Sequence, residues 1–202
     1  LPEREGSMRP ALRDDIIETA RRLFNEKSYG SVSMRNISEA LHISVGNLTY
    51  YFRKKQDILR AIMEKNFQNT AFTEEVQSFR QFDELLRRML ESLSVNAFYF
   101  RDPSVYGLNE GGSQDVNALY EIMLRALLSL EKRGLLTGLS CGKKRESIVR
   151  VLMLSHLGWI QQSPAFCSAN QLSEKEFLEA HWVILKPYFT EAGREEYEKL
   201  GE

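Results

Sequence analysis

The side chains of this sequence whose types and spacing suit a common binding surface lie between residues 44 and 55. Some of them are short and polar, and others are basic. Asn47 and Thr49 offer an amide and a hydroxyl two positions apart, and a basic run of Arg53, Lys54 and Lys55 follows them. Amides and hydroxyls can form hydrogen bonds with base edges, and cationic side chains can bind phosphates. The segment is therefore typical of a surface that docks on duplex DNA.

Motifs of catalysis are missing from the sequence. It contains no nucleophile elbow, phosphate loop, zinc-protease or dinucleotide-binding motif, and its histidines, His42, His156 and His181, are scattered. Cys141 and Cys167 have no metal-ligand spacing, and we interpret them as two separate reduced thiols, with a regulatory disulfide as the lesser alternative. We expect a protein without enzymatic activity, metal or cofactor.

Charge is unevenly distributed along this chain of 202 residues, whose formal net charge is −1. Residues 9–60 carry ten Lys or Arg and six Asp or Glu, whereas residues 61–202 carry 16 and 20. A basic N-terminal segment on an acidic body suits a polyanionic partner that one end of the molecule meets. No apolar run approaches the ~18 residues of a membrane-spanning helix, and we expect a cytoplasmic protein with no membrane partner.

Three helices must position the polar segment. The apolar spacing predicts an amphipathic helix over about 10–27, and Ser33 and Ser44 are suitable N-caps for two short helices of about 34–41 and 45–52. The apolar residues that would join the short helices at their inner faces are Ile37, Leu41, Ile43, Leu48 and Tyr51. This arrangement predicts a helix-turn-helix.

The rest of the sequence is expected to be helical as well. Apolar stripes with helical spacing run through about 56–76, 82–100, 114–133, 143–162 and 173–199, with Pro187 as a kink in the last. No segment alternates apolar and polar residues as a half-exposed strand does. We predict an all-α fold of about nine helices, with an N-terminal three-helix DNA-binding domain at residues 9–56 and a larger helical domain at residues 57–202.

The helix-turn-helix residues also follow a specific pattern. Its positions are Arg13, Ile16, Ile17, Ala20, Leu23, Phe24, Tyr29, Ser33, Met34, Arg35, Asn36, Ile37, Ile43, Ser44, Gly46, Asn47, Leu48, Tyr51, Phe52, Lys55 and Leu59. With this pattern, residues 13–59 resemble the DNA-binding domain of the tetracycline-repressor-like (TetR) family. The family usually has Gly in place of Ser28 and His42, at positions that favour a left-handed backbone, and Tyr in place of Thr49.

The resemblance implies a role for each residue of the DNA-facing surface. The residues that would approach base edges are Ser44, Val45, Gly46, Asn47 and Thr49. The residues that would bind phosphates are Ser33, Arg35, Tyr50, Tyr51 and Lys55. Gly46 would let the backbone come close to DNA, and packing against the first helix is the alternative role for Tyr51.

The resemblance also implies that the body forms a homodimer and binds a small effector. The expected dimer contacts, from the last two long helices, are Ile148, Val151, Leu152, Ser155, Phe177, His181, Trp182 and Leu185. The expected lining of the effector pocket is Phe67, Met89, Phe98, Phe100, Tyr106, Tyr120, Met123, His156 and Trp159. Apolar walls favour a hydrophobic or aromatic effector. Plain core packing is the alternative for each of these residues, as it is for His181.

We therefore expect a TetR-type transcriptional regulator, by analogy a repressor. It would bind a (pseudo)palindromic operator in double-stranded DNA as a dimer. A small effector would release it by acting through the helix that starts near Lys55. The alternative is a DNA-binding protein of the same fold that acts in chromosome organisation or cell division through a protein partner.

Overall fold

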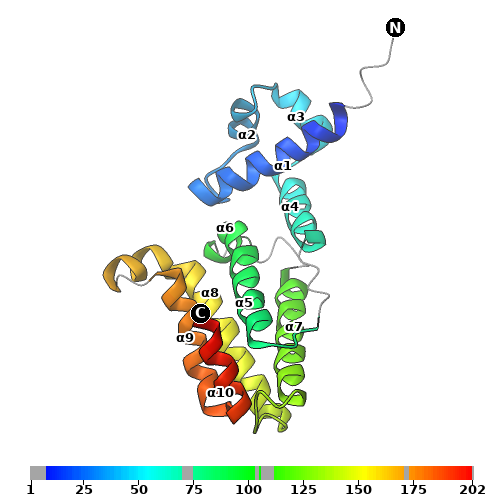
Figure 1. Ribbon diagram of the computed structural model, residues 1–202. Helices are drawn as coiled ribbons and strands as arrows, with labels where there is room; N and C mark the ends of the chain where they lie inside the picture. The colour runs from blue at the N-terminus through cyan, green and yellow to red at the C-terminus, as the bar shows by residue number, and fades with distance from the viewer. Residues whose placement is uncertain (1–7, 70–74, 103–104, 106–111, 171–172, 202) are drawn as a thin grey trace. The chain divides into compact units, whose positions relative to one another are not determined.

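The computed structural model describes residues 8–69, 75–102, 105, 112–170 and 173–201 (Figure 1). The α-helices of these residues are α1 (Met8–Lys27), α2 (Met34–Ala40), α3 (Val45–Tyr51), α4 (Lys55–Asn69), α5 (Phe79–Val95), α6 (Ala97–Arg101), α7 (Gly112–Lys132), α8 (Gly142–Asn170), α9 (Glu174–Leu185) and α10 (Glu191–Glu198). Two 3₁₀ turns follow α9 and α10, η2 (Lys186–Tyr188) and η3 (Lys199–Gly201). No strand occurs in these ranges, which confirms the expected all-α fold. None of these helices is long and apolar enough to span a membrane.

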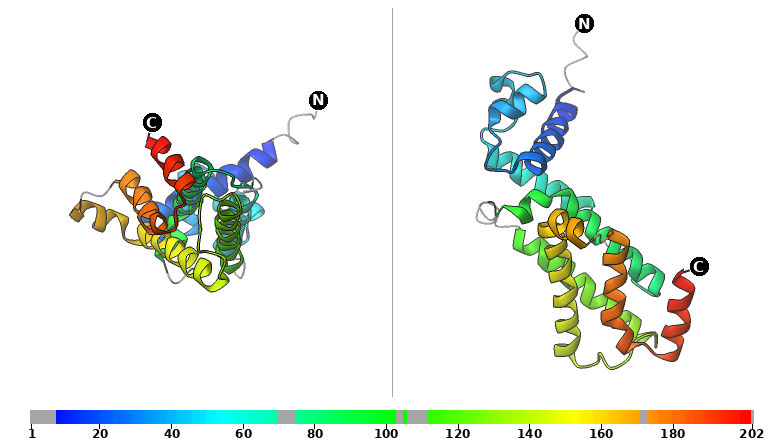
Figure 2. Two further views of the ribbon diagram at one scale, coloured as in Figure 1. Left: turned by 60° about the horizontal axis from the view of Figure 1, so that its bottom comes forward. Right: turned by 90° about the vertical axis from the view of Figure 1, so that its left-hand side faces the viewer.

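The chain divides into two compact units. Unit 1 lies within residues 1–71 and 96–113, and unit 2 lies within residues 72–95 and 114–202. The short helix α6 therefore belongs with α1–α4, whereas α5 belongs with the C-terminal helices. In unit 2, α8 and α9 lie alongside each other with α10 next to α9 (Figure 2).

The prediction of one helix over 82–100 is wrong. α5 ends at Val95, and Asn96 leaves the helical backbone region with φ −116° and ψ 39° before α6 begins. α6 packs on α1, where the side-chain oxygen of Asn25 accepts a hydrogen bond from the backbone N–H of Phe98 at 2.9 Å. Both halves of the apolar stripe are buried, but the half in α5 belongs to the core of unit 2 and the half in α6 belongs to the core of unit 1.

The prediction of one kinked helix over 173–199 is also wrong. α9 ends at Leu185, and Pro187 lies in η2, since proline has no N–H to continue a helix. The connection is held to the loop after α7, where the N–H of Thr137 donates to the carbonyl of Tyr188 at 2.8 Å. α8, by contrast, continues past its expected end near residue 162 to Asn170.

Candidate nucleic-acid interface

The two short helices α2 and α3 begin at serine caps, as expected. The hydroxyl of Ser33 accepts a hydrogen bond from the N–H of Asn36, whose side-chain oxygen accepts one from the N–H of Ser33 in return. The hydroxyl of Ser44 accepts a hydrogen bond from the N–H of Asn47 at 3.0 Å. These bonds satisfy N–H groups that the first turn of a helix leaves free, so they fix where each helix begins.

The backbone turns that precede and join these helices need left-handed residues. Ser28 has φ 70° and His42 has φ 56°, and they are the non-glycine residues of the described chain with positive φ. They occupy the positions where glycine was expected to be favoured, so the prediction of a left-handed backbone there is confirmed. After His42, the N–H of Ile43 donates to the carbonyl of Ser38 at 3.0 Å and closes the corner between α2 and α3.

α3 has one buried side and one exposed side. Leu48 is fully buried in the core of unit 1 together with Ile37. On the other side, Val45 is 42% exposed and Tyr50 is 72% exposed. The N-cap Ser44 and the residues Gly46 and Asn47 are exposed as well, and Thr49 is half-buried. The expected base-reading residues therefore gather on one short helix and its cap.

The expected phosphate-binding residues have different surroundings. Arg35 is exposed, and its Nε lies 2.8 Å from Oε1 of Glu39 in an ion pair on the surface of α2. Ser33 is engaged in the cap of α2. Tyr50 is exposed, whereas the half-buried Tyr51 meets its ring edge-on at a centroid distance of 5.3 Å.

Lys55, at the start of α4, has a structural role that sequence reasoning missed. Its ammonium group donates to the carbonyls of Tyr29 and Val32, each at 2.7 Å, and lies 4.1 Å from the centre of the Tyr29 ring. Burial lowers the pKa of this ammonium group, and the nearby carboxylate of Asp102 partly opposes that effect. Lys55 thus ties α4 to the α1–α2 loop. The predicted phosphate contact would use the third N–H of its ammonium group, and it stays a prediction.

The expected dimer residues on α8 and α9 lie mostly inside unit 2. The chain's own core already buries Ile148, Leu152, Phe177, His181, Trp182 and Leu185. Ser155 is half-buried, and Val151 is 50% exposed. Two apolar residues of the same helices that were not singled out, Leu154 and Val183, are 67% and 64% exposed.

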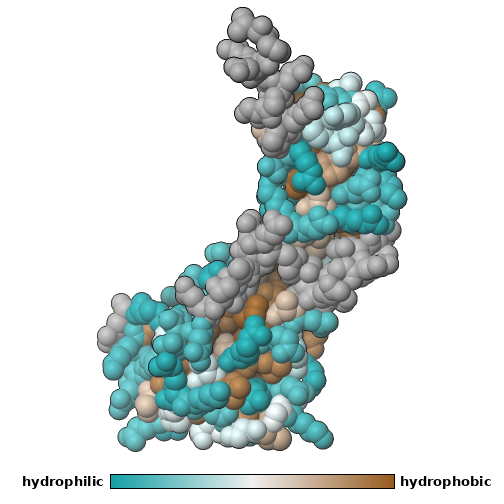
Figure 3. All heavy atoms as spheres, turned by 90° about the vertical axis from the view of Figure 1, so that its right-hand side faces the viewer, coloured by the Kyte–Doolittle hydropathy of each residue, from teal (hydrophilic) through white to brown (hydrophobic). Residues whose placement is uncertain are grey.

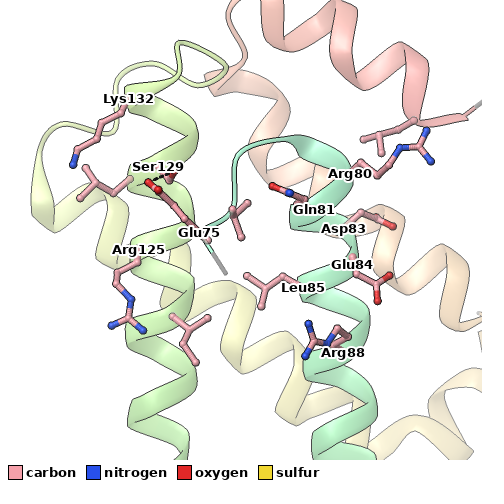
Figure 4. Close-up of a pocket in the computed structure, with 15 residues that line it drawn as sticks. Glu75, Arg80, Gln81, Asp83, Glu84, Leu85, Arg88, Arg125, Ser129 and Lys132 are labelled. Atoms are coloured by element: carbon pink, nitrogen blue, oxygen red, sulfur yellow. Dashed lines mark hydrogen bonds between the residues drawn. The ribbon is translucent and has the colours of Figure 1, made fainter. Parts of the chain in front are cut away.

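The expected effector-pocket residues are dispersed. Those buried in unit 2 are Met89, Met123 and His156, those half-buried there are Tyr120 and Trp159, and those buried in unit 1 are Phe98 and Phe100. Tyr106 and the side chain of Phe67 lie outside the described residues. A cavity of about 1070 Å³ in unit 2 is lined by other residues, most of them from α5 and α7 (Figure 4).

Comparisons with known proteins agree with the geometry of unit 1. The family of bacterial regulatory proteins called the tetR family matches at residues 16–62. The probable HTH-type transcriptional regulator YttP of Bacillus subtilis (strain 168) is 29% identical over 66 residues. That match covers 33% of this chain and 32% of YttP, so the likeness spans about a third of each protein.

Solved structures extend the likeness to the whole fold. A TetR-family transcriptional regulator from Marinobacter aquaeolei VT8 superimposes with a TM-score of 0.78 at 22% identity, over 93% of this chain and 96% of that one. The complex of SmeT with triclosan superimposes with a TM-score of 0.66 at 17% identity, over 90% and 93%. The family match falls on the helix-turn-helix itself, so residues 16–62 of this chain are a DNA-binding domain of the tetR family of bacterial regulatory proteins.

Proposed function

We propose that this chain is a repressor that binds operator DNA as a homodimer and is released by a small molecule. The observation that carries the proposal is the exposed side of α3. Val45 and Tyr50 leave large apolar surfaces uncovered beside the amide of Asn47, although the opposite side of the same helix is fully buried. A helix with short polar and apolar side chains on its exposed face is suited to a major groove about 12 Å wide.

Gly46 supports the same interpretation. A Cβ atom at this position would meet only the hydroxyl of Ser44, at 3.8 Å, and the backbone of Gly46 is helical. The fold of unit 1 therefore does not require glycine here, and glycine weakens a helix relative to alanine. A close approach of the α3 backbone to DNA would explain why this position has glycine.

The exposed apolar residues of α8 and α9 support a dimer. Val151, Leu154 and Val183 are each at least half exposed, and they lie on the two helices through which we expect two copies to pair. A two-fold interface would cover these side chains and present two copies of α3 to two half-sites. Of the residues first expected at this interface, Val151 stays exposed and Ser155 half-buried, whereas the others are buried within the chain's own unit 2.

The proposed release needs a ligand that binds the two states of the dimer with different affinity. The structural relative SmeT is known in complex with triclosan, and unit 2 of this chain contains a cavity large enough for a molecule of that size. We propose that the chain acts by binding alone, without catalysis. α4 and α6 are the candidate elements for the coupling, since both pack against α1 and α6 directly follows α5 in the chain.

Selection from a random duplex library tests the DNA-binding proposal. The full chain is expected to enrich inverted repeats whose half-sites lie about one helical turn apart. Asn47→Ala is expected to change the enriched bases, whereas Arg133→Ala, an exposed change in unit 2, leaves them unchanged. Failure to enrich any sequence, or enrichment of single sites without symmetry, would contradict the proposal.

A further inference from the structure

The cavity of unit 2 is lined by both apolar and charged side chains. It lies between α5 and α7, and Figure 4 shows Leu85 and Arg88 extending from α5 toward α7, with Arg125 and Lys132 along the outer side of α7. At about 1070 Å³ it has the size of a site for a small organic molecule. None of the residues that we expected to form the effector pocket lines it.

Apolar side chains form the walls of the cavity. Leu85 comes from α5, and Ile122, Ala126 and Leu128 come from α7. Val76 adds to this surface from the segment before α5. Figure 3, which shows the side of the molecule where α7 lies, has apolar patches among hydrophilic side chains on unit 2. Such walls suit the hydrocarbon part of a ligand, because burying it removes apolar surface from water.

Charged side chains surround these walls, and the acidic ones are largely engaged. Asp83 accepts a hydrogen bond from the indole N–H of Trp182 at 3.0 Å and pairs with Arg87 at 2.9 Å. Glu75 accepts a hydrogen bond from the hydroxyl of Ser129 at 3.1 Å. These two carboxylates already have donors within unit 2, so they compete weakly for the cations of the cavity.

Three of the four cations of the cavity lack a carboxylate partner in the part of the chain that the structure describes, whereas of its three acids only Glu84 lacks a partner there. The basic residues of the lining are Arg80, Arg88, Arg125 and Lys132, against the acids Glu75, Asp83 and Glu84. Within the described residues, Arg80, Arg125 and Lys132 have no carboxylate partner. The surplus of a single positive charge matches a ligand with one negative charge better than a polyanion.

We propose that this cavity binds an amphipathic organic acid, with its carboxylate at the cationic edge of α7 and its hydrocarbon chain along Leu85, Ile122 and Ala126. Arg125 and Lys132 are seven residues apart on α7, and so about 10 Å apart along the helix axis. A single carboxylate therefore meets one of these cations at a time, and the other keeps this edge of α7 positive. Binding of the acid is independent of the proposed repressor function, whereas its effect on DNA rests on that function.

Titration calorimetry of the full chain without DNA tests the proposal with octanoate, 1-octanol and acetate as probes. Octanoate is expected to bind at least about tenfold more tightly than 1-octanol or acetate, since it has both the charge and the apolar chain. The double variant Arg125→Gln and Lys132→Gln is expected to lose at least that factor. The matched control Arg133→Gln, next to the cavity but outside its lining, keeps the wild-type affinity.

Equal binding of 1-octanol and octanoate, or full affinity in the double variant, would overturn the proposal. Because the substituted side chains are exposed, the thermal unfolding midpoint of the variants is expected to stay unchanged. Displacement of a selected DNA duplex by octanoate is measured separately. Binding of octanoate without displacement would leave the site in place and contradict only its link to the proposed function.

Discussion

Two buried histidines lie side by side in unit 2, and replacing one of them should change how the stability of this unit depends on pH. His156 and His181 are 0% and 1% exposed, and His181 Nε2 lies 3.1 Å from His156 Nδ1. Burial lowers the pKa of both imidazoles, and the proximity of His156 helps to lower the pKa of His181 to about 4. The substitution His181→Asn removes one titrating group from this pair.

Burial favours a neutral pair, and the shorter hydrogen bonds place a proton on each Nδ1, since the second carbonyl near His156, that of Leu86, lies 3.3 Å from its Nε2. His181 Nδ1 donates to the carbonyl of Phe177 at 2.9 Å, which leaves its Nε2 as an acceptor. Ser155 Oγ, at 2.9 Å, and His156 Nδ1 face that acceptor. His156 Nδ1 also lies 2.9 Å from the carbonyl of Leu152, which requires a proton on that nitrogen. Among the described residues no carboxylate is hydrogen-bonded to either ring.

The pKa of His181 fixes the sign and size of the effect. Its ordinary pKa is 6.5 and its folded value is about 4, so the unfolded chain takes up a proton between these values and the folded chain does not. This stabilising contribution is complete above pH 6.5 and is lost as the pH falls toward 4. Between pH 7 and pH 5 it decreases by about 2 kcal/mol.

Urea unfolding at pH 7 and pH 5, at one fixed protein concentration, measures this change. Trp159 and Trp182 are the only tryptophans and both belong to unit 2, so their fluorescence reports on this unit alone. In His181→Asn the side-chain amide can still donate to Phe177, and the loss of stability on acidification is expected to be about 2 kcal/mol smaller. His42→Asn, a change of the exposed histidine, is the control and keeps the wild-type difference. Equal losses in wild type and His181→Asn would refute this account.

Three further substitutions test the packing of particular residues. Gly193→Ala is expected to destabilise unit 2 by about 1–3 kcal/mol, because a Cβ there would lie 2.2 Å from the carbonyl oxygen of Leu135. Gly142→Ala is the control, since a Cβ at that position would have no atom within 4 Å. An unchanged unfolding midpoint of Gly193→Ala would contradict the close packing. His42→Gly is expected to stabilise the chain by about 0.5–1 kcal/mol in thermal unfolding, whereas the helical control Ala40→Gly destabilises it; a loss in His42→Gly would show that the left-handed backbone is not strained. Lys55→Met is expected to lower the midpoint of unit 1, followed by far-UV circular dichroism without DNA, by an amount that corresponds to about 1–2 kcal/mol. Lys54→Met is expected to have little effect, and a Lys55→Met chain that loses only DNA affinity would assign the ammonium to DNA.

Local chemistry made the helix-turn-helix predictable from sequence. Ser33 and Ser44 are good caps in any context, and the left-handed backbone at His42 follows from its place in a short turn. The inner side of α3 was predictable because Leu48 has apolar neighbours at helical spacing. The exposed side followed as its complement.

The features that depend on tertiary contacts could not be predicted. The apolar stripe across Asn96 looks continuous in sequence, and only the contact of α6 with Asn25 of α1 assigns its two halves to different units. From sequence alone, Lys55 is interpreted as a cation that faces DNA, because the sequence does not show that the carbonyls of Tyr29 and Val32 lie beside it. An apolar stripe likewise does not tell whether Trp182 faces the chain's own core or a second copy.

Our claim that the exposed side of α3 enters DNA can be checked with the single substitution Val45→Glu. Val45 is the first residue of α3 and 42% exposed, and a carboxylate in the first turn of a helix is favourable for its stability. The control Ala192→Glu adds the same charge to the exposed first turn of α10. We predict that Val45→Glu unfolds no earlier than wild type but binds the selected duplex at least about tenfold more weakly at equal salt, while Ala192→Glu binds like wild type. Undiminished binding by a folded Val45→Glu chain would contradict the claim.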